Sequence, residues 1–507
     1  MATDRIEQIK TWLTEGLLLC AILLLAIFLG IAIFVRSNAL VDIAALLPAE
    51  ETEGFLVLSR EDSPYPTDFL GHPLAELTWL GRDLAYASMD GEWATFYEIN
   101  SQNSAQTFLD SLKVEGEEYI EHENRVDCFV SLPVCFTFLD DFLVTAPLPE
   151  TLQLLQNATT KLSNSADYQN VRGRIADLRS GFIYINLQKA REELIRYASL
   201  QGISEPGFLE SVFRIFPAFG AGIRMEQTGW YVESFTAVDK TLLGGEPYFH
   251  PTVKYDQMLL PYSQAFAIEW GGQDLSAQIT RIQEILPALN STASLVFESS
   301  LETWLAEIFG QDAITEPDFL ANQLPLFDEE FYFGLTPGED FLLILELTGE
   351  EDLQKAGQLK DRFVQNYEAK NLKTTEQGET RAELSKITTE LKTYQSVQTY
   401  IFNSADAPLA AFALLEDKAI LAGSEETLNG ALDRILSGPL TEGELTKRRA
   451  IEDFRVLLPG SDEIFILNGA FFPEESILNA LLSTFNTLAS TRKLFDDGVY
   501  TRTSLLP

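Results

Sequence analysis

Short apolar, β-rich runs separated by glycine turns recur along this chain. The clearest runs form two pairs, each around a glycine turn: 84–89 with 93–99, and 331–336 with 340–345. Strands joined by such short turns pair antiparallel. A helical period is clearest in 150–162, where the apolar residues recur at three- and four-residue steps: Leu152, Leu155, Ala158 and Leu162. The pattern predicts an α+β fold with antiparallel sheets rather than a parallel, doubly wound sheet.

One stretch departs from this pattern, because residues 17–35 are apolar throughout. As a helix, a stretch of this length spans about 28 Å, close to the hydrocarbon thickness of a bilayer. A cleaved signal peptide has a shorter apolar region of roughly 7–15 residues. The length therefore predicts an uncleaved transmembrane helix at 17–35, preceded by a short tail, 1–16, with the lipid bilayer as the partner of the helix.

The positive residues on either side of this tract suggest its orientation. Arg5 and Lys10 precede the tract, and after Arg36 the next positive residue is Arg60. Because Lys and Arg favour the cytoplasmic side, the N-terminus is predicted to be cytoplasmic and the region after Arg36 extracytoplasmic. The expected location is a cell membrane that the chain crosses once.

Matching segments in two parts of the chain indicate an internal duplication. The longest match aligns Asp140–Leu152 with Glu416–Leu428 without gaps, and Asp141, Ala146, Glu150, Thr151 and Leu152 recur there unchanged. Other matches occur in the same order along the chain: 42–48 with 255–261, 84–99 with 331–345, 182–186 with 464–468, and Gly229 and Tyr231 with Gly498 and Tyr500. Because their order is kept while their spacing changes, duplication of one module with changes in loop length is the simplest explanation.

These matches set the predicted domain boundaries. The first α+β module covers 41–238, a linker containing Gly and Pro covers 239–254, and the second α+β module covers 255–507. The second module has a polar insertion near 365–398 that is rich in Lys, Thr and Glu. We interpret the insertion as a solvated helix or long hairpin, with an interaction arm as the alternative.

Composition and charge exclude some classes of protein. The chain has 507 residues, of which 46% are hydrophobic, so it is not disordered throughout. It carries 36 Lys and Arg against 76 Asp and Glu, a net charge of −40, of which residues 1–35 contribute only −1. This charge argues against binding of nucleic acid through basic contacts to phosphate. On an exported region it would favour solubility and repel anionic surfaces.

A search for catalytic chemistry finds no recognisable motif. The chain lacks HExxH, CxxC, GxSxG and GxxxxGK[ST] sequences, and its three histidines, His72, His122 and His250, are isolated. The tight acidic groups, among them Asp140-Asp141, Asp328-Glu329-Glu330 and Asp496-Asp497, lack the spacing of a calcium loop, and most lie at predicted turns. The sequence therefore predicts no catalytic, cofactor-binding or metal site.

Two of the three cysteines lie close together in the chain, at Cys128 and Cys135, while Cys20 lies within the apolar tract. A two-residue turn at Ser131-Leu132 would place Cys128 opposite Cys135 and permit a cross-strand disulfide in an oxidising compartment. The alternative interpretation is two buried thiols in separate places. The sequence leaves both open.

These features resemble a bacterial family of membrane-anchored envelope proteins, the domain-of-unknown-function family numbered 3352. The resemblance rests on the N-terminal apolar helix, the opening Leu47-Pro48-Ala49, the hairpin beginning Gly81-Arg82-Asp83-Leu84-Ala85, and the later strand followed by Glu-Thr-Leu. It covers nearly all of 40–507, although Leu-Pro-Tyr replaces Leu-Pro-Ala in the second module. It implies an exported, duplicated and anchored protein, and it carries over no catalytic residues.

Together, these observations predict a single-span membrane protein whose acidic, duplicated ectodomain binds or scaffolds an envelope protein or polymer. Two alternatives belong to other classes. One is an extracytoplasmic hydrolase that uses carboxylates in a cleft between the modules. The other is a carrier of an apolar ligand, which needs a cavity lined by the many Phe residues.

Overall fold

The computed structural model describes 42–59, 68–70, 72–114, 119–122, 125–130, 134–175, 180–200, 213–226, 229–239, 241, 266–271, 324–335, 340–370, 372–374, 380–382, 387–403, 408–436, 463–468, 487–495 and 497–506. The predicted tail and membrane span, most of the predicted linker, the 255–261 motif and His250 lie outside the described residues. Among the helices that the structure describes, none has the length and apolar character needed to cross a bilayer.

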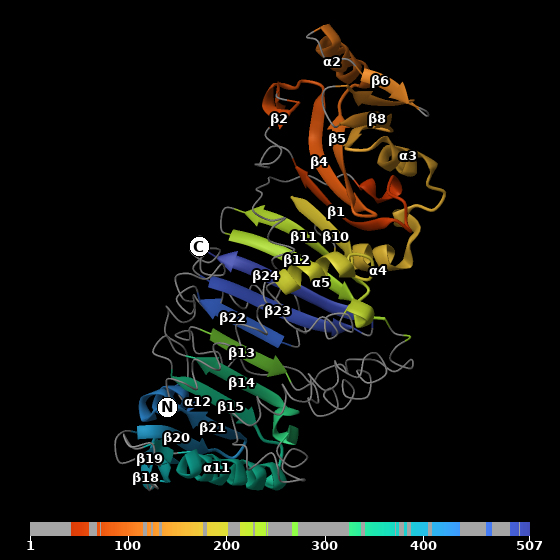
Figure 1. Cartoon of the computed structure of the whole chain (residues 1–507). Coiled ribbons are helices and arrows are strands. Elements are labelled where there is room, and N and C mark those ends of the chain that lie inside the picture. Colours follow the sequence, from red (N-terminus) through yellow and green to blue (C-terminus); the bar gives the residue numbers. More distant parts are fainter. Residues whose placement is uncertain are drawn as a thin grey trace. The chain divides into compact units, whose positions relative to one another are not determined.

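The described chain forms two compact units (Figure 1). The first unit contains the described residues up to 241 together with 497–504, and the second contains those from 266 to 495. The division falls after Leu242, inside the segment predicted to be a linker. The last strand of the chain, β24 (Gly498–Leu506), therefore contributes most of its residues to the first unit.

The first unit is built on an antiparallel sheet whose neighbouring strands follow each other in one continuous order. That order is β11 (Ala218–Glu226), β10 (Gly181–Asn186), β1 (Thr52–Ser59), β4 (Leu80–Met89), β5 (Glu92–Ile99), β9 (Phe142–Ala146), β8 (Cys135–Leu139), β7 (Val126–Phe129) and β6 (Tyr119–His122). Beyond β11 the sheet continues through β12 (Gly229–Ala237) to β24. The turn between β4 and β5 has positive φ at both Asp90 and Gly91, as a two-residue hairpin requires.

The second unit has a sheet with the same order of strands. From one side it runs β23 (Thr487–Phe495), β22 (Glu463–Asn468), β13 (Phe266–Gly271), β14 (Glu330–Leu335), β15 (Phe341–Glu346), β21 (Lys418–Ala422), β20 (Pro408–Leu414), β19 (Val397–Asn403) and β18 (Thr388–Tyr394). The α+β class with antiparallel sheets is thus confirmed.

Helices cover the sheets with their apolar faces. In the first unit they are α2 (Gln102–Val114), α3 (Pro149–Asn157), α4 (Ala166–Arg174) and α5 (Arg191–Leu200), with short 3-10 turns η1 (Ile43–Ala45), η3 (Leu74–Glu76) and η5 (Leu162–Asn164). A small antiparallel ribbon of β2 (Asp68–Phe69) and β3 (His72–Pro73) precedes η3 in the chain. Helix α2 buries Ala105, Leu109 and Leu112 in a core with Trp79, Tyr97 and Phe136.

In the second unit, separate apolar clusters pack with the two main helices. One cluster includes Leu359 of α11 (Glu350–Lys370) and Leu326 of η7 (Leu324–Phe327), and the other includes Leu428 and Leu432 of α12 (Glu425–Leu436). The predicted insertion near 365–398 contains the end of α11, a two-stranded ribbon of β16 (Leu372–Thr374) and β17 (Thr380–Ala382), and β18.

One predicted helix is too long. The apolar period suggested a helix over 150–162, but α3 ends at Asn157 and Ala158 is extended. Leu162 is buried all the same, because it begins η5 and packs there independently of α3. Two threonines follow Ala158, and β-branched residues favour extended backbone, which explains an early end that the apolar spacing alone does not show.

Candidate functional site

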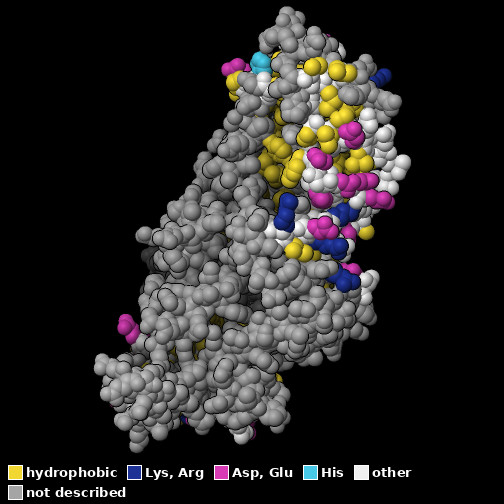
Figure 2. All heavy atoms as spheres, in the orientation of Figure 1, with side chains coloured by type: hydrophobic (Ala, Val, Ile, Leu, Met, Phe, Trp, Pro, Cys, Tyr) yellow, Lys and Arg dark blue, Asp and Glu magenta, His cyan; other side chains and the backbone are white. Residues whose placement is uncertain are grey.

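The two cysteines in question lie opposite each other on β7 and β8 and form a disulfide, with an S–S distance of 2.00 Å. They therefore do not occupy separate places in the fold. Near this hairpin, Ile120 and Val130 have exposed fractions of 58% and 61%, and Trp93 on β5 has 60%. Figure 2 shows apolar side chains gathered on the surface over β5, β8 and α3.

A pocket of about 490 Å³ opens beside helix α2 in the first unit. One wall comes from the chain that leads into β4 and includes His72, Glu76 and Trp79. The other wall is a face of α2, where Ser104, Thr107, Phe108 and Ser111 follow one another at helical spacing. The volume lies within the range of small-molecule sites.

Aromatic contacts hold the floor of this pocket in place. The ring of Phe108 lies 5.6 Å from that of Trp79 and 5.2 Å from that of His72, measured between centroids, and His72 meets it edge-on. Phe69 packs edge-on against Trp79 from the core side, at 5.7 Å. Because Trp79 is buried while Phe108 is half-buried, Phe108 is the ring better placed to meet a ligand.

The turn that carries Trp79 is fixed to the start of β4 by two hydrogen bonds from Asn100, the residue after β5. The backbone N–H of Asn100 donates to the carbonyl of Trp79 (2.8 Å), and the side-chain Nδ2 of Asn100 donates to the carbonyl of Leu80 (2.8 Å). These bonds set the position from which β4 begins. They are a rigid support for one wall of the pocket.

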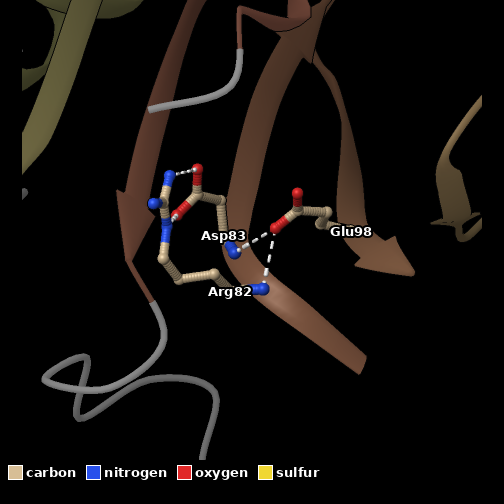
Figure 3. A network of polar contacts seen from close by, with 3 residues as sticks. All are labelled: Arg82, Asp83 and Glu98. Atoms are coloured by element: carbon tan, nitrogen blue, oxygen red, sulfur yellow. Dashed lines mark hydrogen bonds and ion pairs between the residues drawn. The ribbon is translucent and has the colours of Figure 1, made fainter. Parts of the chain in front are cut away.

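A polar network follows directly in β4, where Gly81, Arg82 and Asp83 together face Glu98 across a β-bulge (Figure 3). One carboxylate oxygen of Glu98 accepts from the backbone N–H groups of Arg82 (2.7 Å) and Asp83 (2.8 Å). The guanidinium of Arg82 donates to both carboxylate oxygens of Asp83, at 2.8 and 3.0 Å. Asp83 is buried, so this pairing compensates its charge.

Gly81 makes this network sterically feasible. A Cβ at that position would lie 2.7 Å from Cγ and 2.8 Å from Oε2 of Glu98. The carboxylate of Glu98 is held by two N–H groups and cannot move away without losing them. Part of the Gly-Arg-Asp-Leu-Ala motif thus has a structural role, because it builds the bulge next to the pocket.

The acidic groups found in the sequence do not gather at this pocket. Asp140 and Asp141 form the turn between β8 and β9, where Asp140 has a φ of 47°. Asp328, Glu329 and Glu330 lie at the start of β14, and Asp497 pairs with Arg174 through two oxygens at 2.8 Å. The described residues contain no cluster of three or more side chains suited to hold a metal ion.

Among the described residues, Asp167 and Glu329 are the carboxylates with raised pKa values, and neither lines the pocket. Burial raises the pKa of Asp167 on α4, assisted by the charge of Asp239 and opposed by Lys189. Burial also raises the pKa of Glu329, with Glu346, Asp352 and Asp328 adding to the effect. The pocket itself contains one carboxylate, Glu76, and one phenylalanine, Phe108, so it provides neither an acid pair nor a Phe-lined cavity.

Sequence reasoning missed this site. His72 was classed as an isolated histidine, yet it lines the pocket; His122 lies in β6. The signal in the sequence is the face of α2 that flanks its buried residues, where hydroxyl and aromatic side chains share one stripe. No sequence pattern shows that the β3–β4 connection lies across from this stripe.

Comparisons with known proteins provide no identity. No family model matches the chain, and no curated protein matches it. Solved structures described as crystal forms IV and III of TP0453 are similar at 10% sequence identity, with TM-scores of 0.26 and 0.25; each match covers 43% of this chain, and 89% and 90% of the matched chains. These values carry no argument about function, and the resemblance to the family numbered 3352 stays a prediction.

Proposed function

We propose that this chain is a single-span membrane protein whose acidic, duplicated ectodomain is a binding module of the cell envelope. The observation that carries the proposal is the disulfide between Cys128 and Cys135. Disulfides persist in oxidising compartments and are rare in the cytosol. The disulfide supports an extracytoplasmic position for the first unit, as expected from the charges that flank the apolar tract.

The segment that follows the predicted span is built firmly into the first unit. Ile43, Ala44 and Leu47 are fully buried, and the amide of Leu162 donates to the carbonyl of Leu47 (2.8 Å). The ammonium group of Lys161 donates to the carbonyls of Leu46 (3.2 Å) and Leu155 (3.1 Å). Only 36–41 separate the tract from Asp42, a reach of about 25 Å at most, so the proposed anchor would hold this unit near the bilayer.

A second lysine ties the same segment to the chain after β10. Lys189 donates through Nζ to the carbonyls of Ala49 (2.6 Å) and Glu50. Burial lowers the pKa of Lys189, and the neighbouring acids, Glu51 first among them, oppose this shift. These bonds make the junction stiff, as a tethered module requires if its orientation at the membrane is to be defined.

The strand registers support the proposed duplication. Leu58 lies opposite Gly181 on one side and Leu84 on the other, and Trp270 lies opposite Glu463 and Phe331 in the same arrangement. A hydrogen bond outside the ladders recurs as well. The backbone N–H of Ile99 donates to the carbonyl of Asp141 (2.9 Å). In the second unit, the backbone N–H of Leu347 donates to the carbonyl of Asp417 (2.8 Å).

The binding role is assigned to the pocket beside α2. It has the volume of a small-molecule site, a half-buried aromatic ring and polar groups on both walls, which are typical of recognition sites. The bulge network and Asn100 support one wall. The apolar side chains gathered on the surface over β5 and β8 (Figure 2) offer a further contact area on the same unit.

Protease added to the outside of intact cells, or of spheroplasts if an outer membrane is present, tests the topology. With epitope tags at both ends of the full chain, the C-terminal tag should be lost while the N-terminal tag stays protected. Survival of the region after Arg36 would contradict the proposal, provided that detergent lysis makes the same region sensitive. Alkylation of thiols before and after reduction should show Cys128 and Cys135 oxidised in the same cells.

A further inference from the structure

The hydroxyl groups on the pocket face of α2 donate hydrogen bonds locally, within the helix and its N-terminal turn. Thr107 donates through Oγ1 to the carbonyl of Asn103 (2.7 Å), and Ser111 donates through Oγ to that of Phe108 (2.6 Å). Ser104 donates to the Oγ of Ser101 (3.1 Å). A hydroxyl has one proton and two lone pairs, so this wall of the pocket presents acceptors to a ligand.

The opposite wall adds a negative charge. Glu76 lies exposed at the pocket, and an ionised carboxylate only accepts hydrogen bonds. The ring of Phe108 contacts His72 and Trp79 of this wall and is half-buried, and aromatic rings attract cations. The net charge of −40 on the chain gives a field that also concentrates cations near its surface.

Acceptors, a carboxylate and an aromatic ring together match one ligand chemistry. From this arrangement we infer that the α2 pocket binds a small organic cation, an ammonium or guanidinium group, with Glu76 as its counter-ion. His72 and Thr78 also line the pocket and can donate hydrogen bonds, so glucose serves below as a neutral polyol to compare, while an anion would meet the carboxylate of Glu76 without a counter-charge. The inference rests on the proposed function of the first unit as a binding module and names the class of ligand for it.

Binding of benzylamine to the full chain in detergent tests the inference by isothermal titration calorimetry at pH 7. Benzylamine carries an ammonium group on a ring that the pocket can hold, and benzyl alcohol is a neutral control of nearly the same shape. We expect benzylamine to bind at least about fivefold more tightly than benzyl alcohol, the ratio that about 1 kcal/mol of charge interaction produces. Equal affinities, or tighter binding of benzyl alcohol or of glucose, would overturn the inference.

Two variants place the interaction in this pocket. Glu76→Gln keeps the shape of the side chain and removes its charge, and Phe108→Leu removes the ring; each should weaken benzylamine about threefold to fivefold. The matched control is Glu192→Gln, which removes one charge from an exposed position on α5. Equal weakening by Glu192→Gln would show that general charge, and not the pocket, attracts the amine, and would overturn the assignment to Glu76.

Fluorescence gives a second readout that does not depend on heats of binding. Trp79 lines the pocket and touches Phe108, so benzylamine should change its emission, and Trp79→Phe should remove that change. Persistence of the change in Trp79→Phe would place the amine elsewhere and contradict the inference.

The source of the cation is tested by competition. Spermidine in solution and vesicles containing phosphatidylethanolamine are added separately against benzylamine, with phosphatidylglycerol vesicles as control. Displacement by spermidine alone supports a free amine, and displacement by the first vesicles alone supports a lipid headgroup. Displacement by phosphatidylglycerol vesicles would contradict the ligand class. If benzylamine does not bind while the topology experiment succeeds, the ligand class is wrong and the proposed location is unaffected.

Discussion

The start of β4 in the first unit and the start of β14 in the second occupy corresponding positions in two sheets with the same strand order, but their chemistry is opposite. Leu84 lies opposite Leu58 and Tyr97, as Phe331 lies opposite Trp270 and Leu345. The residues just before Leu84 are Gly81, Arg82 and Asp83, whereas those before Phe331 are three acids: Asp328, Glu329 and Glu330. The residue after Tyr97 is Glu98, and the residue after Leu345 is Glu346.

The carboxylates at this position, Glu98 and Glu346, therefore have different neighbours in the two units. Glu98 accepts from two backbone N–H groups of the bulge, and an Arg–Asp pair lies beside it. In the second unit, burial first and the charge of Glu346 second raise the pKa of Glu329. The shared strand order fixes where these residues lie, and their identities decide the contacts at each of the two corners, as we call the start of β4 with Glu98 and the start of β14 with Glu346.

The disulfide shows the same contrast. Cys128 and Cys135 are opposite each other, with Ala146 beyond Cys135 on β9; in the second sheet Ile401 and Ala411 are opposite each other, with Ala422 beyond. Ile401 and Ala411 are buried in an apolar cluster. At this position the first unit joins its strands with a covalent bond, whereas the described residues of the second unit pack there as part of an apolar cluster.

The strongest test of this contrast is Glu98→Ala compared with Glu346→Ala. Loss of Glu98 leaves two backbone N–H groups of the bulge without their charged acceptor, and we expect a loss of about 3 kcal/mol in stability. Glu346→Ala removes a like charge that raises the pKa of Glu329, but also an opposite charge directly across the ladder from the buried Lys418, so the two effects offset and stability should change by less than about 0.5 kcal/mol. Hydrogen exchange read by mass spectrometry separates the two units and shows which one opens.

An equal loss of stability from both variants would contradict this expectation, because it would mean that Glu98 and Glu346 contribute equally despite their different contacts. Glu98→Gln is the conservative control for the first corner. Its amide oxygen can still accept from the backbone, so its effect should be smaller than that of Glu98→Ala.

Replacing both Cys128 and Cys135 by Ser should cost about 2 kcal/mol, because the disulfide closes a short loop and constrains the unfolded chain. The effect should be confined to β6–β8, and exchange in β19 and β20 should not change. Reductant should destabilise the parent protein to the same extent and leave the double variant unaffected. A response to reductant in the double variant would assign the effect to something other than this bond.

The variant Asp497→Asn tests how much the C-terminal residues 497–504 stabilise the first unit. Asp497→Asn weakens a two-oxygen contact with Arg174, whose guanidinium also lies 5.7 Å from the ring of Phe235. Because both charged groups are partly exposed, we expect a loss of about 1 kcal/mol. Amides of β24 should exchange faster, and Glu416→Gln, a substitution of an exposed acid in the second unit, should have no such effect.

Much of the fold could be predicted from local pattern, since the hairpin at Asp90-Gly91 and the strands around 182–186 and 464–468 lie where the sequence indicated. These elements follow from the residues that favour turns and from short apolar, β-rich runs, both of which act over a few residues. The helix over 150–162 was wrong because an apolar spacing of three and four residues can span a helix and a separate turn. Tertiary packing, not one helical face, buries both Leu155 and Leu162.

The candidate site could not be predicted, because its walls are about 30 residues apart in sequence and meet only through the core under α2. The Gly81-Arg82-Asp83 motif was noticed as part of a resemblance, but its contact with Glu98 depends on a bulge that shifts the register. A bulge leaves no reliable mark in a pattern of period two.

The smallest expected effect concerns Glu329, and it has the opposite sign to that of Glu98→Ala. A raised pKa means that the folded state holds a proton more tightly than the unfolded state, so stability decreases as pH rises from the ordinary Glu value, about 4.3, through the raised value. Glu329→Gln cannot lose that proton and should be more stable than the parent by a few tenths of a kcal/mol at pH 7. Below about pH 4 the two proteins should converge, because Glu329 is then neutral in both states. Denaturant titrations across this pH range check the trend, and a variant less stable than the parent at pH 7 would show that Glu329 is compensated after all, which would remove the contrast between the two corners.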